Sequence, residues 1–142
     1  MKALIIGCGR VGSSIALQLL SEEWEVTVVD ENEDALSRLG SHWPGAFLVG
    51  HGLDVDLLRE AGIEESDAVV VATDGDNTNI VIGQVAQKRF GIDCVVVRIL
   101  DPARADFYSS RGLRAVCPTK VAIDTLTDAV RACEIPGARV AS

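Results

Sequence analysis

The chain has 142 residues, of which 48% are hydrophobic and 24% are charged, as is usual for one soluble globular domain. Its 21 acidic and 13 basic side chains give a net charge of −8, which repels polyanions and argues against a nucleic-acid partner. The longest stretch without a charge, residues 39–53, contains four glycines and a proline, so we expect no membrane-spanning helix.

Two further features favour a cytoplasmic protein. The apolar run at the start of the chain is too short for a signal peptide. The cysteines form no CxxC pair, so we expect reduced thiols and neither a zinc site nor a disulfide framework. They are Cys8, Cys94, Cys117 and Cys133.

Short apolar runs alternate with helical patterns along the whole chain. Strands are predicted at residues 2–6, 25–29, 46–49, 68–72, 94–99 and 115–117. Helices are predicted at residues 11–21, 33–39, 55–61, 77–90, 102–111 and 119–133, with Thr119 as the cap of the last one. Most strands are continuous runs of Val, Ile, Leu and Ala, which indicates a sheet covered on both faces. The fold class is therefore α/β, a Rossmann-like, doubly wound parallel sheet of six strands in three layers, followed by a C-terminal helix.

A glycine-rich loop follows the first predicted strand and opens a helix. Its sequence is Gly7-Cys8-Gly9-Arg10-Val11-Gly12, a GxGxxG in the context that supports dinucleotide binding. In this motif the first glycine makes the tight turn, the second lets a pyrophosphate approach the backbone, and the third lets the helix pack on the strand. The free N–H groups at the helix start would then face the phosphates.

An acidic residue, Asp30, ends the second predicted strand, 18 residues after Gly12. The carboxylate that accepts the ribose hydroxyls in dinucleotide-binding folds stands about 20 residues after the glycines. A carboxylate there repels a 2′-phosphate, which favours NAD-type or adenosine nucleotides over NADP. The alternative is a coincidental glycine-rich turn with Asp30 as a helix cap.

Several side chains near this loop have two interpretations. Arg10 either donates to a phosphate or is a solvated surface arginine. Cys8 is expected to fill space rather than to act as a catalytic thiol, and His51 either contacts the ligand or is solvated. No metal site is expected, because too few carboxylates converge for an oxygen cage. The carboxylates considered are Asp54, Asp74 and Asp76.

Three longer segments give a specific resemblance. They are LLREAGIEESDAVV at residues 57–70, ATDGDNTN at residues 72–79 and VRILDPARADFYSSRGL at residues 97–113. Together with the glycine loop they resemble the TrkA/Ktr N-terminal domain, also called the RCK or KTN domain, of bacterial potassium transport regulators. The resemblance implies a cytoplasmic, nucleotide-sensing regulatory subunit or domain that is not an enzyme. It also implies binding of NAD(H) or ATP/ADP, and gating of a potassium-conducting membrane protein at the inner face of the cell membrane.

The resemblance assigns site residues position by position. The phosphate loop is matched by Gly7, Cys8, Gly9, Arg10, Val11 and Gly12, the ribose acid by Asp30 and the adenosine neighbour by Glu31. The loop that closes over the adenine is matched by Gly50, His51 and Leu53, the end of the fourth strand by Thr73 and Asp74, the next helix start by Asn79, and the arginine after the fifth strand by Arg98. The family usually carries a GDxTD-like run after the third strand. Here His51 and Gly52 depart from it, which leaves the choice between NAD and ATP open.

The last predicted helix carries an apolar stripe at spacings of three and four residues. Its members are Ala122, Ile123, Leu126, Ala129, Val130 and Cys133. In the resembled family this helix crosses to a neighbouring subunit, so we expect residues 1–117 to form the nucleotide-binding domain and residues 118–142 an intersubunit helix and tail. The expected assembly is a homodimer, or a tetramer or octameric ring. The alternative is a helix packed on its own sheet.

The alternative function is a small NAD-dependent dehydrogenase or a fragment of one. A dehydrogenase needs a substrate pocket with an acid or base close to the reacting carbon. A six-stranded fold uses nearly all of the 142 residues, which argues for sensing rather than chemistry. Many members of the resembled family carry a second, C-terminal ligand domain, and the sequence leaves open whether one follows Ser142.

Overall fold

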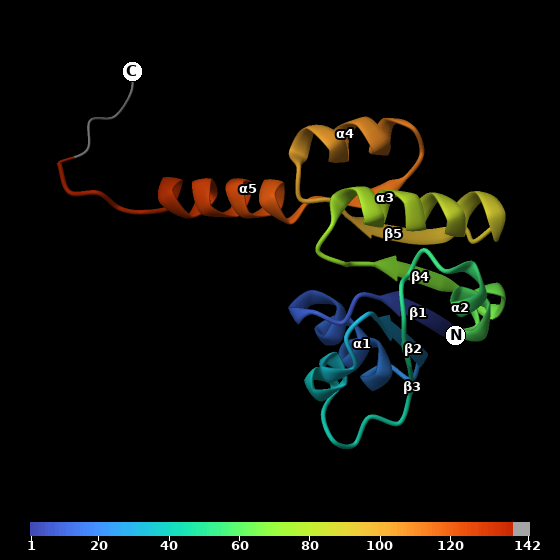
Figure 1. Cartoon of the computed structure of the whole chain (residues 1–142). Helices are drawn as coiled ribbons and strands as arrows, with labels where there is room; N and C mark the ends of the chain where they lie inside the picture. Colours follow the sequence, from blue (N-terminus) through green and yellow to red (C-terminus); the bar gives the residue numbers. More distant parts are fainter. Residues whose placement is uncertain (138–142) are drawn as a thin grey trace.

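The computed structural model describes residues 1–137 and is built on one parallel sheet (Figure 1). Its strands are β1 (Lys2–Ile6), β2 (Glu25–Asp30), β3 (Ala46–Val49), β4 (Ala68–Val71), β5 (Cys94–Arg98) and β6 (Arg114–Val116). They lie in the order β3-β2-β1-β4-β5-β6, and every neighbouring pair is parallel. This is the Rossmann strand order, so the predicted fold class is confirmed.

Helices connect these strands across both faces of the sheet. The α-helices are α1 (Arg10–Ser21), α2 (Val55–Glu60), α3 (Asp76–Gln84), α4 (Pro102–Ser110) and α5 (Pro118–Arg131). Two short 3₁₀ segments are η1 (Glu33–Leu39) and η2 (Ile63–Glu65), and η3 (Val85–Arg89) is a π-helical turn. None of the described helices is long and apolar enough to cross a bilayer.

The core consists of two clusters, one on each face of the sheet. Alternate residues of β1 divide between them, since successive side chains of a strand point to opposite faces. Ile5 joins Ala16 of α1 and Leu39 of η1 in one cluster. Leu4 joins the larger cluster, which includes Ile82 of α3. The expected three layers are therefore present, with α1 and η1 on one face and α2, α3 and α4 on the other.

Two predicted helices differ from the structure in type. Residues 33–39 form a 3₁₀ helix, in which Asn32 accepts the N–H of Asp34 at 2.9 Å. The predicted helix 77–90 begins at Asp76 and changes to a π-helical turn at Val85. Hydrophobic periodicity indicates a buried helical face, but it does not distinguish three, 3.6 and more residues per turn over so short a segment.

Helix α5 extends away from the body of the domain (Figure 1). In the described chain none of its residues is buried, and Leu126 and Val130 are 67% and 63% exposed. The expectation that Thr119 caps this helix is wrong, because Cys117 is the N-cap and its Sγ accepts the N–H of Lys120 at 3.4 Å. Pro118 occupies the first helical position, where its missing N–H costs nothing.

The buried amide of Asn79 joins the ends of β4 and β5. Its Oδ1 accepts the backbone N–H of Thr73 at 3.0 Å and also contacts the Thr73 hydroxyl. Its Nδ2 donates to the carbonyls of Thr73 and Arg98, both at 2.9 Å. One side chain therefore fixes two adjacent strand ends at the edge of the sheet where the loops meet.

Replacing Asn79 with Ala should destabilise the fold, because the Thr73 N–H and the Arg98 carbonyl lose this partner and the Thr73 carbonyl keeps only its bond from Arg98 Nη2. An unpaired buried polar group costs about 1–3 kcal/mol. We expect the free energy of unfolding, measured by urea titration, to fall by at least that amount. Asn77→Ala on the same helix removes only an exposed contact with Arg104 and should change it little. Equal stability of the two variants would contradict the conclusion that Asn79 fixes the ends of β4 and β5.

Candidate functional site

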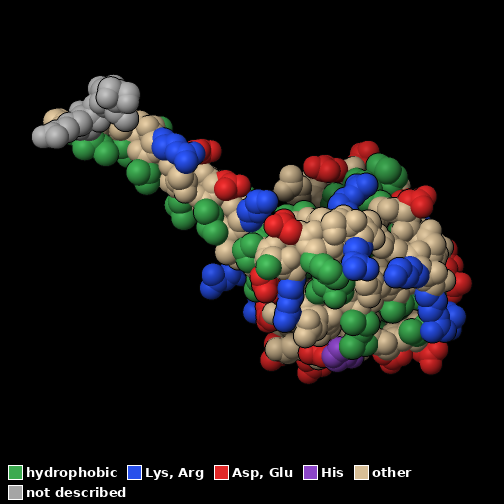
Figure 2. Space-filling model, turned by 90° about the horizontal axis from the view of Figure 1, so that it is seen from above, with side chains coloured by type: hydrophobic (Ala, Val, Ile, Leu, Met, Phe, Trp, Pro, Cys, Tyr) green, Lys and Arg blue, Asp and Glu red, His purple; other side chains and the backbone are tan. Residues whose placement is uncertain are grey.

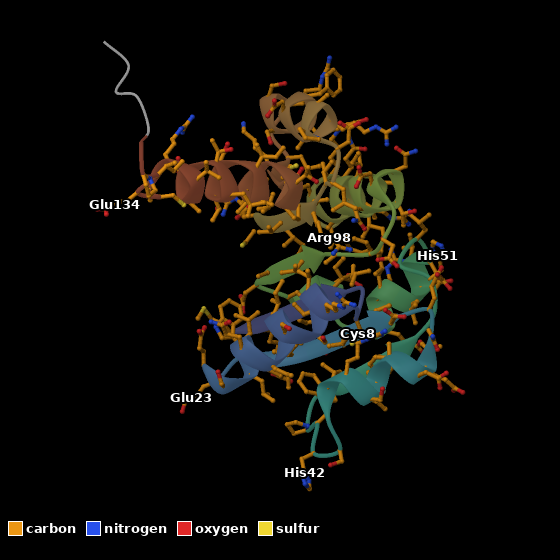
Figure 3. All side chains as sticks on the ribbon, turned by 90° about the vertical axis from the view of Figure 1, so that its left-hand side faces the viewer. Cys8, Glu23, His42, His51, Arg98 and Glu134 are labelled. Carbon is orange, nitrogen blue, oxygen red and sulfur yellow. The ribbon has the colours of Figure 1, made fainter. Side chains whose placement is uncertain are left out.

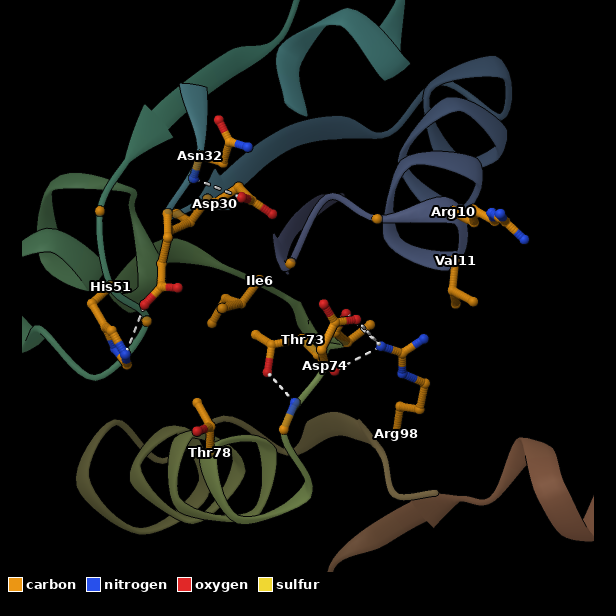
Figure 4. Close-up of a pocket in the computed structure, with 18 of the residues that line it drawn as sticks. Ile6, Arg10, Val11, Asp30, Asn32, His51, Thr73, Asp74, Thr78 and Arg98 are labelled. Atoms are coloured by element: carbon orange, nitrogen blue, oxygen red, sulfur yellow. Dashed lines mark hydrogen bonds and ion pairs between the residues drawn. The ribbon is translucent and has the colours of Figure 1, made fainter. Parts of the chain in front are cut away.

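A cavity of about 700 Å³ lies at the carboxyl ends of the strands, where the strand order reverses between β1 and β4 (Figure 4). In doubly wound sheets this crevice is where ligands bind. The lining residues are Ile6, Gly7, Gly9, Arg10, Val11, Val29, Asp30, Glu31, Asn32, Arg38, Gly50, His51, Gly52, Ala72, Thr73, Asp74, Gly75, Thr78 and Arg98. The volume falls within the range of small-molecule and cofactor sites.

Three glycines shape the cavity floor. A Cβ on Gly12 would stand 1.8 Å from the carbonyl oxygen of Gly7, so only glycine lets α1 start this close to the loop. Gly7 itself has φ +101°, and a Cβ there would lie 2.5 Å from the carbonyl oxygen of Ala72. A Cβ on Gly9 would meet nothing within 4 Å, which leaves room for a ligand over the loop.

The start of α1 is open toward this space. Gly9 is its N-cap, and no side chain of residues 1–137 caps its first turn. The first N–H groups of a helix have no partner inside the helix, and the helix dipole adds partial positive charge there. This end of α1 is therefore built to receive an anionic group.

Asp30 holds the phosphate loop against the end of β2. Its Oδ2 accepts the backbone N–H of Cys8 at 2.7 Å, and its Oδ1 accepts the N–H of Asn32 at 2.8 Å. A carboxylate has about four acceptor sites, so both oxygens can still accept a hydroxyl from a ligand. Asp30 thus shapes the loop and also lines the cavity.

The thiol of Cys8 points away from the cavity. It is fully buried and donates to the carbonyl oxygen of Ala35 at 3.4 Å. Burial raises its pKa, the negative charge of Asp30 adds to this, and the positive charge of Arg38 opposes it. At neutral pH the thiol is therefore protonated, as a space-filling role requires and a nucleophile would not.

His51 and Glu31 form the rim of the cavity on the β2–β3 side. His51 Nε2 lies 2.8 Å from Glu31 Oε1, and His51 Nδ1 accepts the N–H of Leu53 at 3.2 Å. Because Nδ1 accepts a hydrogen bond, the N–H of the ring is at Nε2, and this N–H donates a hydrogen bond to the Glu31 carboxylate. The pair joins the loops that follow β2 and β3. Figure 3 shows His51 at the end of the sheet opposite Glu23.

Arg98 closes the opposite side of the cavity. Its Nη2 donates to the carbonyls of Thr73 at 2.7 Å and Ala72 at 3.2 Å, and lies 3.6 Å from Asp74 Oδ1. Its Nε is buried without a hydrogen-bond partner among the described residues. The guanidinium therefore ties β5 to the end of β4 at the cavity wall (Figure 4).

Eleven of the fifteen predicted site residues line this cavity. They are Gly7, Gly9, Arg10, Val11, Asp30, Glu31, Gly50, His51, Thr73, Asp74 and Arg98. The other four do not line the cavity but contact residues that do. Gly12 packs against Gly7, and Asn79 bonds Thr73 and Arg98. The backbone N–H of Cys8 donates to Asp30, and that of the exposed Leu53 donates to His51.

Eight lining residues were not predicted from the sequence. They are Ile6, Val29, Asn32, Arg38, Gly52, Ala72, Gly75 and Thr78. Seven of them stand within four residues of predicted site positions, so extending each motif would have found them. Arg38 is the exception. It reaches the cavity from η1, and its Nη1 donates to the carbonyl of Cys8 at 3.1 Å.

The charges of the cavity suit a phosphorylated ligand with hydroxyl groups. Arg10, Arg38 and Arg98 line it from three elements, and within residues 1–137 neither Arg10 nor Arg38 has a carboxylate within 4 Å. Guanidinium and backbone N–H groups bind phosphate oxygens, whereas Asp30 accepts hydroxyl protons. Within residues 1–137 no group of three or more His, Cys, Asp or Glu side chains is arranged to hold a metal ion.

The sequence of this chain is similar to those of known potassium uptake proteins. Residues 3–119 match the family model of the TrkA-N domain. The Trk system potassium uptake protein TrkA of Streptomyces coelicolor is 41% identical over 126 residues, which are 89% of this chain and 56% of that protein. Its namesake from Vibrio alginolyticus is 37% identical over 102 residues, 72% of this chain and 22% of that protein. The chain thus spans from about a fifth to just over half of these relatives.

Solved structures share the fold at low sequence identity. The TrkA-N domain of the inner membrane protein YbaL from Escherichia coli has a TM-score of 0.80 at 18% identity, with 91% of this chain and 96% of that chain covered. The C-terminal domain of Kef from Shewanella denitrificans in AMP-bound form has a TM-score of 0.78 at 21% identity, with coverages of 92% and 80%. GsuK bound to ADP has a TM-score of 0.76 at 23% identity, with coverages of 89% and 33%. The chain is a member of the TrkA-N domain family.

Proposed function

We propose that this chain is a nucleotide-sensing regulatory domain that binds NAD(H) or ATP/ADP in the cavity between β1 and β4. The observation that carries the proposal is the open start of α1 over Gly9, with unpaired Arg10 and Arg38 beside it in an acidic chain. The AMP and ADP in structures of the same fold support an adenine nucleotide.

Each wall of the cavity suits one part of such a ligand. The N–H groups at the start of α1, with Arg10, would hold the phosphates. Asp30 would accept the hydroxyls of the adenosine ribose, and the rim made by His51 and Glu31 would enclose the adenine. The side lined by Thr73, Asp74 and Arg98 would take the far end of the ligand. That end is the second nucleoside of NAD(H) or the terminal phosphates of ATP.

The partner would be a potassium-conducting membrane protein, reached from the cytoplasmic side. The names of the relatives support this, since they are potassium uptake proteins. A ligand shifts a conformational equilibrium only by its differential affinity for the two states. The fold offers a route for such a shift. Arg98, at the end of β5, pairs with Val116 of β6, and α5 begins two residues after Val116.

Two substitutions test the nucleotide site by calorimetry with NADH, NAD, ATP and ADP. Arg10→Ala removes a cation that holds no part of the fold, and a hydrogen bond to a charged group contributes about 1.5–3 kcal/mol. We expect a loss of affinity of about tenfold or more with unchanged unfolding. Asp30→Ala should lose more, because it also releases the phosphate loop.

Asp56→Ala is the matched control, since its carboxylate is 95% exposed on α2 and away from the cavity. It should bind all four nucleotides like the parent protein. Absence of heat with every nucleotide for the parent protein would contradict the proposed function.

The rival function, a small dehydrogenase, predicts turnover. A regulatory domain should bind NADH without consuming it. We therefore expect no loss of NADH absorbance with any of a panel of carbonyl acceptors, at NADH concentrations that saturate the protein. Steady oxidation of NADH that Arg10→Ala abolishes would favour the dehydrogenase.

We also propose that α5 pairs with a second copy of this chain. Its apolar stripe has no partner in the described chain, with Ile123, Leu126 and Val130 between 54% and 67% exposed. Figure 2 shows hydrophobic side chains along one side of the projecting helix. In a symmetric dimer the apolar stripes of the two copies would be buried against each other.

Charge on the stripe should prevent this pairing. We expect the double variant Leu126→Asp with Ala129→Asp to be monomeric by size-exclusion chromatography with light scattering, and the parent protein to be at least dimeric. Thr127→Asp, which adds a charge beside the stripe, is the control and should leave the assembly unchanged. A double variant that remains dimeric would show that α5 is not the interface.

A further inference from the structure

The unpaired cations of this acidic chain gather at two places. Within residues 1–137, six Lys and Arg side chains have no carboxylate within 4 Å. Two of them, Arg10 and Arg38, line the cavity already described. The other four are Lys88, Arg89, Arg111 and Arg114, and all four are exposed. We call these four residues the basic corner.

One hydrogen bond brings the basic corner together. Gln87 Nε2 donates to the carbonyl of Gly112 at 3.3 Å and joins η3 to the turn between α4 and β6. Lys88 and Arg89 directly follow Gln87, whereas Arg111 and Arg114 flank Gly112 within two residues. In Figure 2, Lys and Arg side chains lie among Asp and Glu side chains over the end of the body away from α5.

The basic corner lies at the edge of the sheet away from the cavity. Arg114 is the first residue of β6, and the cavity is at the carboxyl ends of the strands. Helix α5 starts after the other end of β6. A molecule bound at the basic corner would therefore leave both the nucleotide site and the α5 stripe free.

Local stabilisation explains only part of this arrangement. Lys88 and Arg89 lie in the last turn of η3 and Arg111 is the C-cap residue of α4, so all three complement a helix dipole. Arg114 stands on an edge strand and has no such role. Asp93, the nearest acid along the chain to Arg89, forms no ion pair with any of the four within the described residues.

An exposed aromatic ring adjoins these cations. Phe107 is 48% exposed, and the Arg111 guanidinium lies over its ring at 4.5 Å from the centroid. None of the four cations lines the cavity at the strand ends or the shallow hollow at residues 33–43. Exposed cations that line neither of these hollows, with an adjoining aromatic ring, suit a layer of anionic headgroups better than an extended peptide.

We propose that the basic corner binds the anionic phospholipid surface of a membrane. At physiological ionic strength the Debye length is about 8 Å, so the negative charges of the chain that lie farther than this from the basic corner are largely screened, and the charges at the corner itself dominate the interaction. Each Lys or Arg near an anionic bilayer strengthens binding by about fivefold. This contact would hold the domain near the bilayer independently of its nucleotide and of its protein partner.

Vesicle sedimentation with the full chain tests the proposal. The protein should sediment with vesicles of equal parts phosphatidylglycerol and phosphatidylcholine, but not with phosphatidylcholine alone, and rising salt should release it. The variant with Lys88, Arg89, Arg111 and Arg114 each changed to Gln should lose at least a hundredfold in partitioning. It should remain folded with a cooperative unfolding transition, because all four side chains are exposed. The loss of cations at helix ends and of the Arg111 contact with Phe107 should lower its stability only slightly.

The matched control removes the same charge elsewhere. It changes Lys2, Arg104, Lys120 and Arg131 to Gln, all exposed and each ion-paired with a carboxylate. It should still bind the anionic vesicles. Equal loss in the control, equal binding to both vesicle types, or no binding at low salt would overturn the proposal. Binding of soluble polyglutamate without binding of vesicles would also overturn it and indicate an acidic protein partner.

Discussion

The contact between Gly12 and Gly7 is the constraint on which the site depends. With a side chain at position 12, a Cβ would stand 1.8 Å from the Gly7 carbonyl oxygen, and α1 would have to move away from β1. The present approach leaves the first N–H groups of α1 facing the crevice and leaves Gly9 uncovered. Asp30 then fixes the loop from the neighbouring strand through the Cys8 N–H. The anion-binding character of the cavity follows from backbone geometry before any charged side chain is counted.

Much of the fold and part of the site could be predicted because they depend on local patterns. Continuous apolar runs gave the six parallel strands, and the interval between Gly12 and Asp30 placed a loop and an acid at adjacent strand ends. Parallel strands bring their carboxyl ends to one edge, so residues such as Thr73 and His51 line the same cavity although they are far apart in the chain. The family resemblance added the positions after the third, fourth and fifth strands.

What the sequence left out depends on contacts that no short pattern encodes. Arg38 lines the cavity from η1, a 3₁₀ helix outside the predicted site segments, and its guanidinium donates to the Cys8 carbonyl. Asn79 was expected at the ligand, yet its amide is used entirely by Thr73 and Arg98. The bond between Glu31 and His51 depends on how two loops approach each other. Helix α5 is amphipathic in sequence and the family resemblance implied an intersubunit helix, but the pattern alone also allowed packing on its own sheet, and the structure leaves its apolar side exposed.

The domain combines a site shaped by backbone atoms with an exposed amphipathic helix. Native mass spectrometry of the freshly purified protein tests this joint claim most directly, because one spectrum reports both the bound ligand and the number of chains. We predict a dimer or larger assembly that carries one adenine nucleotide per chain, released as the mass of NAD(H), ADP or ATP on activation. A monomer without ligand that also fails to take up any of these nucleotides would contradict the account.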